Sequence, residues 1–132
     1  MSRGPGRLQR GITALMMKHP DGTFSLAQLC RHLYCGEAIE KKHRVAILRA
    51  MHNLRTRDWD IWQREAHGPH SELILYNAAS LASTQAAMGS TYPGHEGRWR
   101  QIAVERVEHH IAQRDGKLAR AEEIEAKWAA EE

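Results

Sequence analysis

The sequence lacks long apolar runs. Its apolar stretches all fall short of the roughly 18 residues that a membrane-spanning helix requires, and its start, MSRGPGRLQRG, lacks the apolar segment of a secretory signal. It also has only two cysteines, Cys30 and Cys35, five residues apart in and just beyond a predicted helix. A disulfide between them is not expected, and reduced thiols are typical of a cytoplasmic protein.

The residue patterns of enzymes are missing as well. Asp58 and Asp60 place two carboxylates at the start of a predicted strand, but a metal-dependent nuclease also needs a positioned base or lysine, and the next lysine is Lys117. There is no glycine-rich loop ending in Gly-Lys-Ser or Gly-Lys-Thr to hold a phosphate. No serine or cysteine has the neighbours of a catalytic nucleophile. We therefore expect no enzymatic activity and no cofactor.

The nine histidines raise the question of a metal site. Cys30 and Cys35, with His32 and His43 nearby, come closest to a ligand set. However, a Cys-x4-Cys spacing with Cys30 on a buried helical face matches zinc sites poorly. Core thiols and surface imidazoles are the simpler interpretation, so we expect no bound metal.

Positive charge is concentrated in one part of the chain. The formal net charge is only +3. Residues 1–77 contain 12 Lys or Arg and 7 Asp or Glu, whereas residues 78–132 contain 7 and 9. The segment 41–57, KKHRVAILRAMHNLRTR, has six Lys or Arg and no acid. Such a concentration on one element indicates a negatively charged partner better than the overall charge does.

Apolar spacing predicts three helices in the first part of the chain. The first covers 7–19 and ends at the turn sequence PDG, with Gly11 inside it for close packing. A short extended piece precedes the second helix, for which Ser25 and Gln28 form a Ser-x-x-Gln capping box. The third helix covers 41–57, and its start lies between residues 37 and 41.

After the third helix the apolar period changes to that of strands. WDIWQREAHGPHSELILYN predicts a β-hairpin with strands 59–64 and 72–76. Residues 78–97 are small and nearly uncharged, which indicates a linker with at most a short helix near 80–88. Residues 98–132 are helical again. The predicted fold is therefore mainly α with a small β-hairpin.

The helix at 41–57 has two different faces. Met51 marks the centre of its buried face, and Ile47, Leu48 and Leu54 lie within about 60° of it. The opposite face carries small and basic side chains and no acid: Lys42, Val45, Ala46, Arg49, Asn53 and Thr56. Arginine can bond guanine and asparagine can bond adenine bidentately, and a valine methyl can touch that of thymine. This face suits a DNA major groove, although most basic helix faces are simply solvated.

The order of these elements resembles the winged helix-turn-helix superfamily over about residues 7–77. The resemblance implies DNA binding, with the helix at 41–57 as the recognition helix and REAHGPH as the wing. The DNA-contacting positions that follow are Gln28, Arg31, Lys41, Lys42, Arg44, Val45, Arg49, Asn53, Arg64, His67 and His70. Val45, Arg49 and Asn53 are expected at base edges and the others at phosphates or in the wing. The connection YCGEAIEKKH is longer than a tight helix-turn-helix turn.

The C-terminal segment carries an apolar seam at a 3-4-3-4 spacing, interrupted by Arg114 and Glu125. Such a seam forms a coiled coil with a second copy or packs against the chain's own N-terminal part, and Asp115-Gly116 can divide it into two helices. We expect a homodimer, since a symmetric dimer doubles the short DNA site that one helix reads. The residues assigned to it are Val104, Val107, Ile111, Leu118 and Trp128.

These patterns lead to two functional hypotheses. The first is a dimeric transcriptional regulator that binds specific double-stranded DNA through the helix at 41–57 and the wing. The alternative is a winged-helix interaction module or adaptor that binds a protein partner through its C-terminal helices. No membrane partner is expected.

Overall fold

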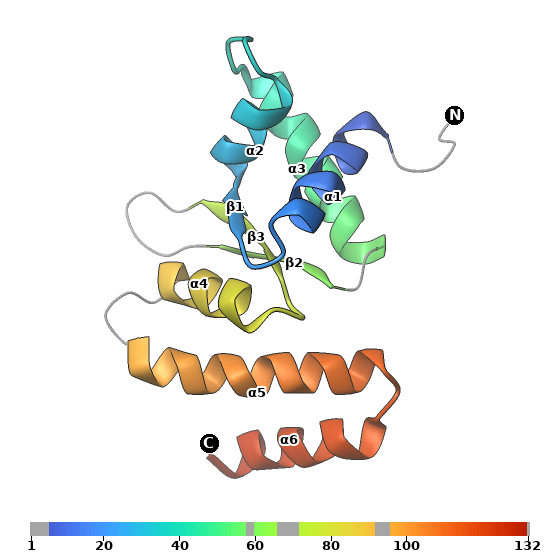
Figure 1. The fold of residues 1–132 in the computed structure, drawn as a ribbon, viewed down its shortest axis with the longest axis vertical. Helices are drawn as coiled ribbons and strands as arrows, with labels where there is room; N and C mark the ends of the chain where they lie inside the picture. The colour runs from blue at the N-terminus through green and yellow to red at the C-terminus, as the bar shows by residue number, and fades with distance from the viewer. Residues whose placement is uncertain (1–5, 58–59, 66–71, 92–95, 132) are drawn as a thin grey trace.

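The structure is a computed structural model that describes residues 6–57, 60–65, 72–91 and 96–131. Within these residues it has six helices and a small antiparallel sheet (Figure 1). The elements are α1 (Arg7–Lys18), β1 (Thr23–Ser25), α2 (Leu26–Leu33), α3 (Lys41–Arg57), β2 (Ile61–Glu65), β3 (Leu73–Asn77), α4 (Leu81–Thr91), α5 (Glu96–Arg114) and α6 (Leu118–Glu131). The predicted fold class, mainly helical with a small β component, is confirmed.

The sheet has three strands in the order β1-β3-β2, all antiparallel. Ile61 pairs with Asn77 at one end of the predicted hairpin, whose strands lie one or two residues further along than expected. The sequence predicts β1 only as an isolated extended piece, but Phe24 pairs with Leu75 and adds a third strand. This pairing joins segments far apart in the chain, so local patterns do not predict it.

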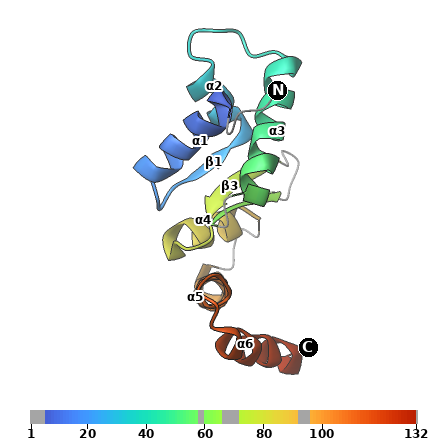
Figure 2. The same ribbon diagram turned by 90° about the vertical axis from the view of Figure 1, so that its right-hand side faces the viewer.

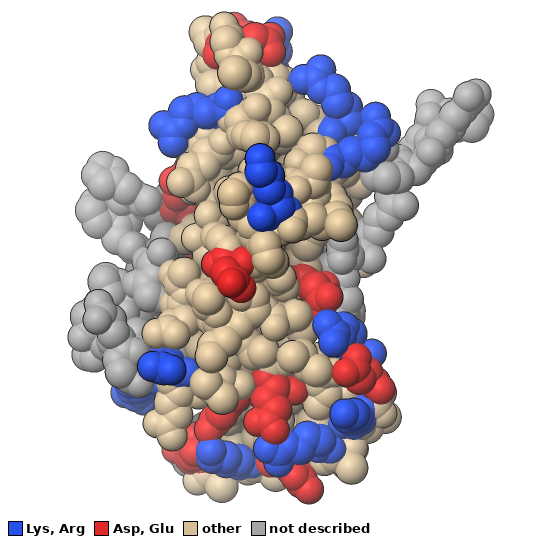
Figure 3. Space-filling view, viewed as in Figure 1, with Lys and Arg blue, Asp and Glu red and all other residues tan. Residues whose placement is uncertain are grey.

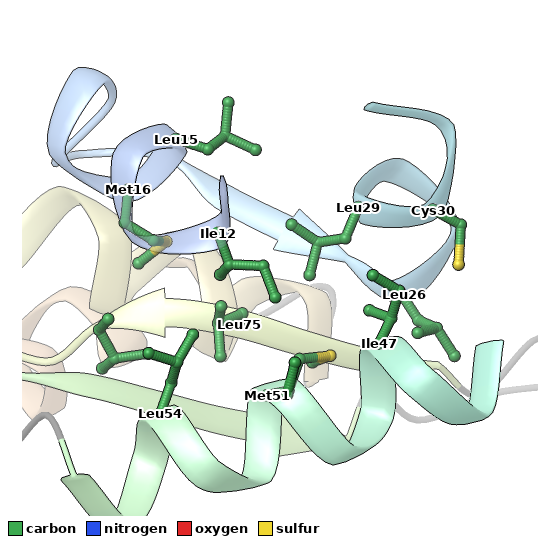
Figure 4. Close-up of a cluster of buried hydrophobic side chains, with 12 residues drawn as sticks. Ile12, Leu15, Met16, Leu26, Leu29, Cys30, Ile47, Met51, Leu54 and Leu75 are labelled. Carbon is green, nitrogen blue, oxygen red and sulfur yellow. The ribbon is translucent and has the colours of Figure 1, made fainter. Parts of the chain in front are cut away.

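The main core lies between one face of this sheet and the helices α1, α2 and α3 (Figure 4). Its fully buried side chains come from all three helices and from the central strand: Ile12, Leu29, Ile47, Met51 and Leu75. Burial of each large aliphatic side chain stabilises the fold by roughly 1.5–3 kcal/mol. Ile47, Met51 and Leu54 are all buried, as the helical spacing predicts.

Two local features of the predicted helices are confirmed. The capping box of α2 is formed, because Ser25 Oγ accepts from the Gln28 backbone N–H at 3.2 Å and Gln28 Oε1 accepts from the Ser25 N–H at 2.8 Å. At Gly11, a Cβ atom would lie 2.5 Å from Cδ2 of Leu33. Glycine therefore lets α1 approach α2 closely. This close packing explains why a glycine stands inside α1, although glycine weakens a helix.

The second face of the sheet is covered by α4, with α5 and α6 stacked beyond it (Figure 2). α4 lies in the segment that the sequence indicates as a linker and is longer than the short helix expected near 80–88. Its small side chains allow close approach to the sheet. Ser83 Oγ accepts from the Asn77 N–H and donates to the Gly22 carbonyl, both at 2.8 Å. Small residues here form a packing surface.

The C-terminal segment packs against its own chain. A turn at Gly116, whose φ of 74° favours glycine, separates α5 from α6 where the sequence predicts a break. His110 Nε2 lies 2.7 Å from Asp60 Oδ1, and Arg114 Nη1 lies 3.3 Å from Asp60 Oδ2. These contacts attach α5 to the start of β2.

We predict that two substitutions at Gly11 change the free energy of unfolding by different amounts. Gly11→Val should lower the free energy of unfolding by about 2 kcal/mol, because the branched side chain overpacks against Leu33. Gly11→Ala should have a much smaller effect, since about 1 kcal/mol of helix propensity offsets the displacement of one flexible methyl group. Urea denaturation of both variants checks this, and equal stability of the two would contradict the close contact.

Candidate functional site

The outer face of α3 is the candidate site. The start of this helix is fixed by a reciprocal contact in which His43 Nδ1 accepts from the Glu40 N–H at 3.0 Å, while the Glu40 carbonyl accepts from the His43 N–H. His43 is buried against Tyr34, with ring centroids 4.2 Å apart, so the expectation of a surface imidazole is wrong at this position. With the inner face in the core, α3 runs along the margin of the molecule, and no described helix covers its outer side (Figure 2).

The three residues expected at base edges share this outer face. Val45 is 42% exposed, and Arg49 and Asn53 are exposed as well. Ala46 is half-buried between them. Thr56 differs from the others, because its hydroxyl donates to the backbone carbonyl of Asn53 at 3.0 Å and is engaged within the helix. With Lys42, the face therefore presents one ammonium group, one guanidinium, one amide and small apolar groups.

Most of the basic side chains of α3 have no acidic partner. Lys41, Arg44, Arg49 and Arg55 are exposed and form no ion pair with any residue that the structure describes. Lys42 is the exception: its Nζ lies 3.4 Å from Glu40 Oε2. Both side chains of that pair are well exposed, so the pair contributes little. The positive charge of this surface is thus uncompensated within the described part of the chain.

Several charges of the C-terminal helices are paired with one another. Arg120 binds Glu108 and Glu123, and Lys127 binds Glu105. The hydrogen bonds from Lys127 and from the Trp128 indole lower the pKa of Glu105. Figure 3 views the molecule from the side of α1 and α2 and shows acidic and basic side chains side by side over α5 and α6.

The phosphate positions expected on α2 are less uniform. Arg31 is exposed in the last turn of α2. Gln28 is exposed too, but its amide oxygen is engaged in the capping box and only its amide N–H group is left to contact a phosphate. Arg7 and Arg10 of α1 are also exposed, although no sequence pattern marked them as candidate DNA contacts. Arg7 donates to the Leu33 carbonyl at 3.3 Å, a contact that no sequence pattern predicts.

The structure does not bring Arg64 together with the outer face of α3. Its side chain is half-buried and hydrogen-bonds to the Tyr76 hydroxyl, on the sheet face that α4 covers. Burial raises the pKa of Tyr76, and the positive charges of Arg64, Arg106 and Arg55 oppose that shift. The other two residues expected in a wing, His67 and His70, lie outside the described residues.

The expected dimerisation residues fall into two groups. Val104, Val107 and Ile111 line an apolar groove on α5, together with Leu81 of α4 and Glu108. Val104 is 44% exposed there. Leu118 is 64% exposed but does not line the groove. Trp128 packs within the chain, where its Nε1 donates to Glu105 Oε2 at 2.9 Å.

Two further findings bear on the possible partners. In the described part of the chain, no helix combines the length and apolar character that crossing a membrane requires. The described residues also contain no group of three or more His, Cys, Asp or Glu side chains placed to hold a metal ion. Cys30 is buried, and burial raises the pKa of its thiol.

Comparison of the chain with protein-family models, with curated proteins and with solved structures finds no match.

Proposed function

We propose that the protein binds double-stranded DNA through the outer face of α3, as a winged helix-turn-helix transcriptional regulator. The observation that carries this proposal is the surface of α3 itself. It places Arg49 and Asn53 outward with Val45 and has no acid among its residues. Among the residues that the structure describes, most of its basic side chains have no acidic partner. A solvated helix normally interleaves acids with its bases, because opposite charges three or four residues apart stabilise it.

The arrangement around α3 supports the same proposal. The order α1-β1-α2-α3-β2-β3 is the order by which the sequence resembles the superfamily, and β1 adds to the hairpin as a third strand. The core behind α3 holds the helix rigidly, with Ile47 and Met51 fully buried. A rigid helix positions its outer side chains without an added ordering cost on binding.

The chemistry assigns a role to each part of the surface. Arg49 and Asn53 are the base-reading residues, since each can form two hydrogen bonds to one purine in the major groove, and the Val45 methyl groups suit thymine. Phosphate contacts come from the exposed cations at the flanks, which are Arg31, Lys41, Lys42 and Arg44, with a minor part for Gln28. His67 and His70 belong to the wing. Arg64 is better assigned to the sheet, where Tyr76 holds it.

A second copy of the chain is the proposed occupant of the α5 groove. The exposed stripe of α5 has Arg100 at one end and the groove residues in the middle. Asp115 follows directly after the other end, where it also binds Arg114 at 3.1 Å. An antiparallel pairing centred between Val107 and Glu108 sets Val104 opposite Ile111 of the second copy and Arg100 opposite its Asp115. A parallel pairing would set like charges together, so the stripe is complementary to itself in one direction only.

This interface is narrow, and the dimer is therefore weak. A strip one helix wide buries less than the roughly 1,600 Å² of a standard interface. Dimerisation becomes strong when two half-sites on one DNA hold the copies together, because the second contact is then intramolecular. Weak association of the free chain fits a regulator that dimerises on its operator.

The decisive test of DNA binding is charge reversal on α3. Arg49→Glu should weaken binding of the full chain to a DNA duplex at least roughly tenfold, because a bidentate contact is worth about 1–3 kcal/mol and the new carboxylate repels phosphate. Lys117→Glu is the matched control, with the same charge change at an exposed turn between α5 and α6. Fluorescence anisotropy measures both, and equal affinity of the two variants contradicts the proposal.

The dimer has its own test by charge exchange. Arg100→Asp alone and Asp115→Arg alone should each weaken self-association of the full chain, since each sets like charges opposite one another. The double variant, with the charges exchanged, should restore it. Sedimentation velocity over a concentration series measures the self-association. If both single variants associate more weakly and the double variant does not recover, the antiparallel pairing is ruled out.

The α5 groove also favours the second candidate function, an interaction module or adaptor. Two results together would support this second function: the chain stays monomeric at every concentration, and the Arg49→Glu variant binds DNA as well as the control variant does. The α5 groove would then bind a different protein. Under that outcome α3 would be an ordinary solvated helix, and the C-terminal helices would carry the function.

A further inference from the structure

A cavity of about 200 Å³ lies between the second face of the sheet and the C-terminal helices. β2 and β3 contribute Trp62 and Tyr76, α5 contributes Arg106, His109 and His110, and α6 contributes Trp128. The cavity lies on the other face of the sheet from the main core in which the inner face of α3 is buried. It takes no part in the DNA contacts proposed above.

The walls of the cavity are largely aromatic. The rings of Trp62 and His110 meet edge to face, with centroids 5.7 Å apart. On the other side, the rings of His109 and Trp128 lie 4.9 Å apart at 51°. Indole and imidazole walls favour a flat ligand, since ring stacking and edge contacts add to the burial of apolar area.

The electrostatics of the cavity favour an anion. Its described lining includes a guanidinium and two imidazoles but no carboxylate. Three acids beside the cavity bind lining residues: Asp60 binds His110, Glu125 binds His109, and Glu105 binds the Trp128 indole as well as Lys127. Arg106 is therefore the lining cation that no described acid pairs with. Arg64, Arg106 and Arg55 also place positive charge near Tyr76, where it opposes the rise in pKa that burial causes. This positive charge favours an anion as well.

Arg106 is the group placed to receive the charge. Its guanidinium carbon lies 6.0 Å from the centroid of the Trp128 ring, and it forms no ion pair with any described residue. A guanidinium can hold a carboxylate bidentately while it stacks on an aromatic face. Arg106 and Trp128 together therefore form a site for a charged group attached to a ring.

We propose that this cavity binds a small planar aromatic carboxylate, with its ring against the indoles of Trp62 and Trp128 and its carboxylate on Arg106. The volume limits the size of the ligand, because sites for drug-sized molecules measure about 300–1,000 Å³. One ring or two fused rings fit. Because its walls come from both the hairpin and the C-terminal helices, an occupied cavity ties α5 and α6 to the sheet.

The test is calorimetric titration of the full chain with benzoate, 1-naphthoate and indole-3-acetate, each compared with its uncharged amide. At least one acid should bind with a dissociation constant below about 1 mM, and its amide should bind at least about tenfold more weakly. Arg106→Gln should remove this preference, while Lys117→Gln should keep it. Arg106→Lys, which keeps the charge but loses the bidentate geometry, should retain part of it.

The indole N–H resonances of Trp62 and Trp128 give a readout of where the ligand binds, and both should shift on titration. Binding by none of the three acids, equal binding of acid and amide, or shifts confined to the other two tryptophans overturns the proposal. If Arg106→Gln fails to fold, the lysine variant and the resonance shifts of the unaltered chain decide the outcome. Loss of DNA binding in the Arg49→Glu variant has no bearing on this result.

Discussion

The packing of α3 against the sheet and the other two N-terminal helices is the constraint on which the rest of the structure depends. Ile47 and Met51 are fully buried, and this fixes the rotation of the helix about its axis. Because successive residues turn by about 100°, the side chains half a turn away must point outward. Val45, Arg49 and Asn53 are therefore held on the surface by the core beneath them. The candidate site thus depends on hydrophobic burial as much as on its own charges.

The hairpin connects two parts of the molecule that have different chemistry. Side chains alternate along its strands, so that Ile61 and Leu75 join the main core while Trp62 and Tyr76 face α4 and the C-terminal helices. On the first side lies a surface whose positive charge is largely uncompensated within the described residues. On the second side Asp60 pairs with His110 and Arg114, and aromatic rings line the cavity. Under the two proposals, one small chain carries a DNA surface and a ligand site on opposite sides of the sheet.

Local patterns predicted the helical part of the fold well. The buried face of α3 around Met51, the capping box and the close packing at Gly11 follow from spacing within a few residues, so the sequence alone indicates them. The features that the sequence could not indicate depend on residues far apart in the chain. β1 forms because Phe24 pairs with Leu75, and α4 packs as a helix because its small side chains fit against the sheet. Within the candidate site the same rule holds. The outward face of α3 was predictable, whereas the engagement of Arg64 by Tyr76 required the folded chain.

The central claim is that α3 presents a surface for DNA, and its salt dependence tests that claim most directly. The full chain would be titrated by fluorescence anisotropy onto a random duplex of about 25 base pairs, long enough for nonspecific contacts, over a range of salt concentrations. Each neutralised phosphate contributes about 0.9 to the slope of log K against log salt, so DNA binding through α3 predicts a slope of about −4 or steeper. An absent or salt-independent response would contradict it and point to a protein partner instead.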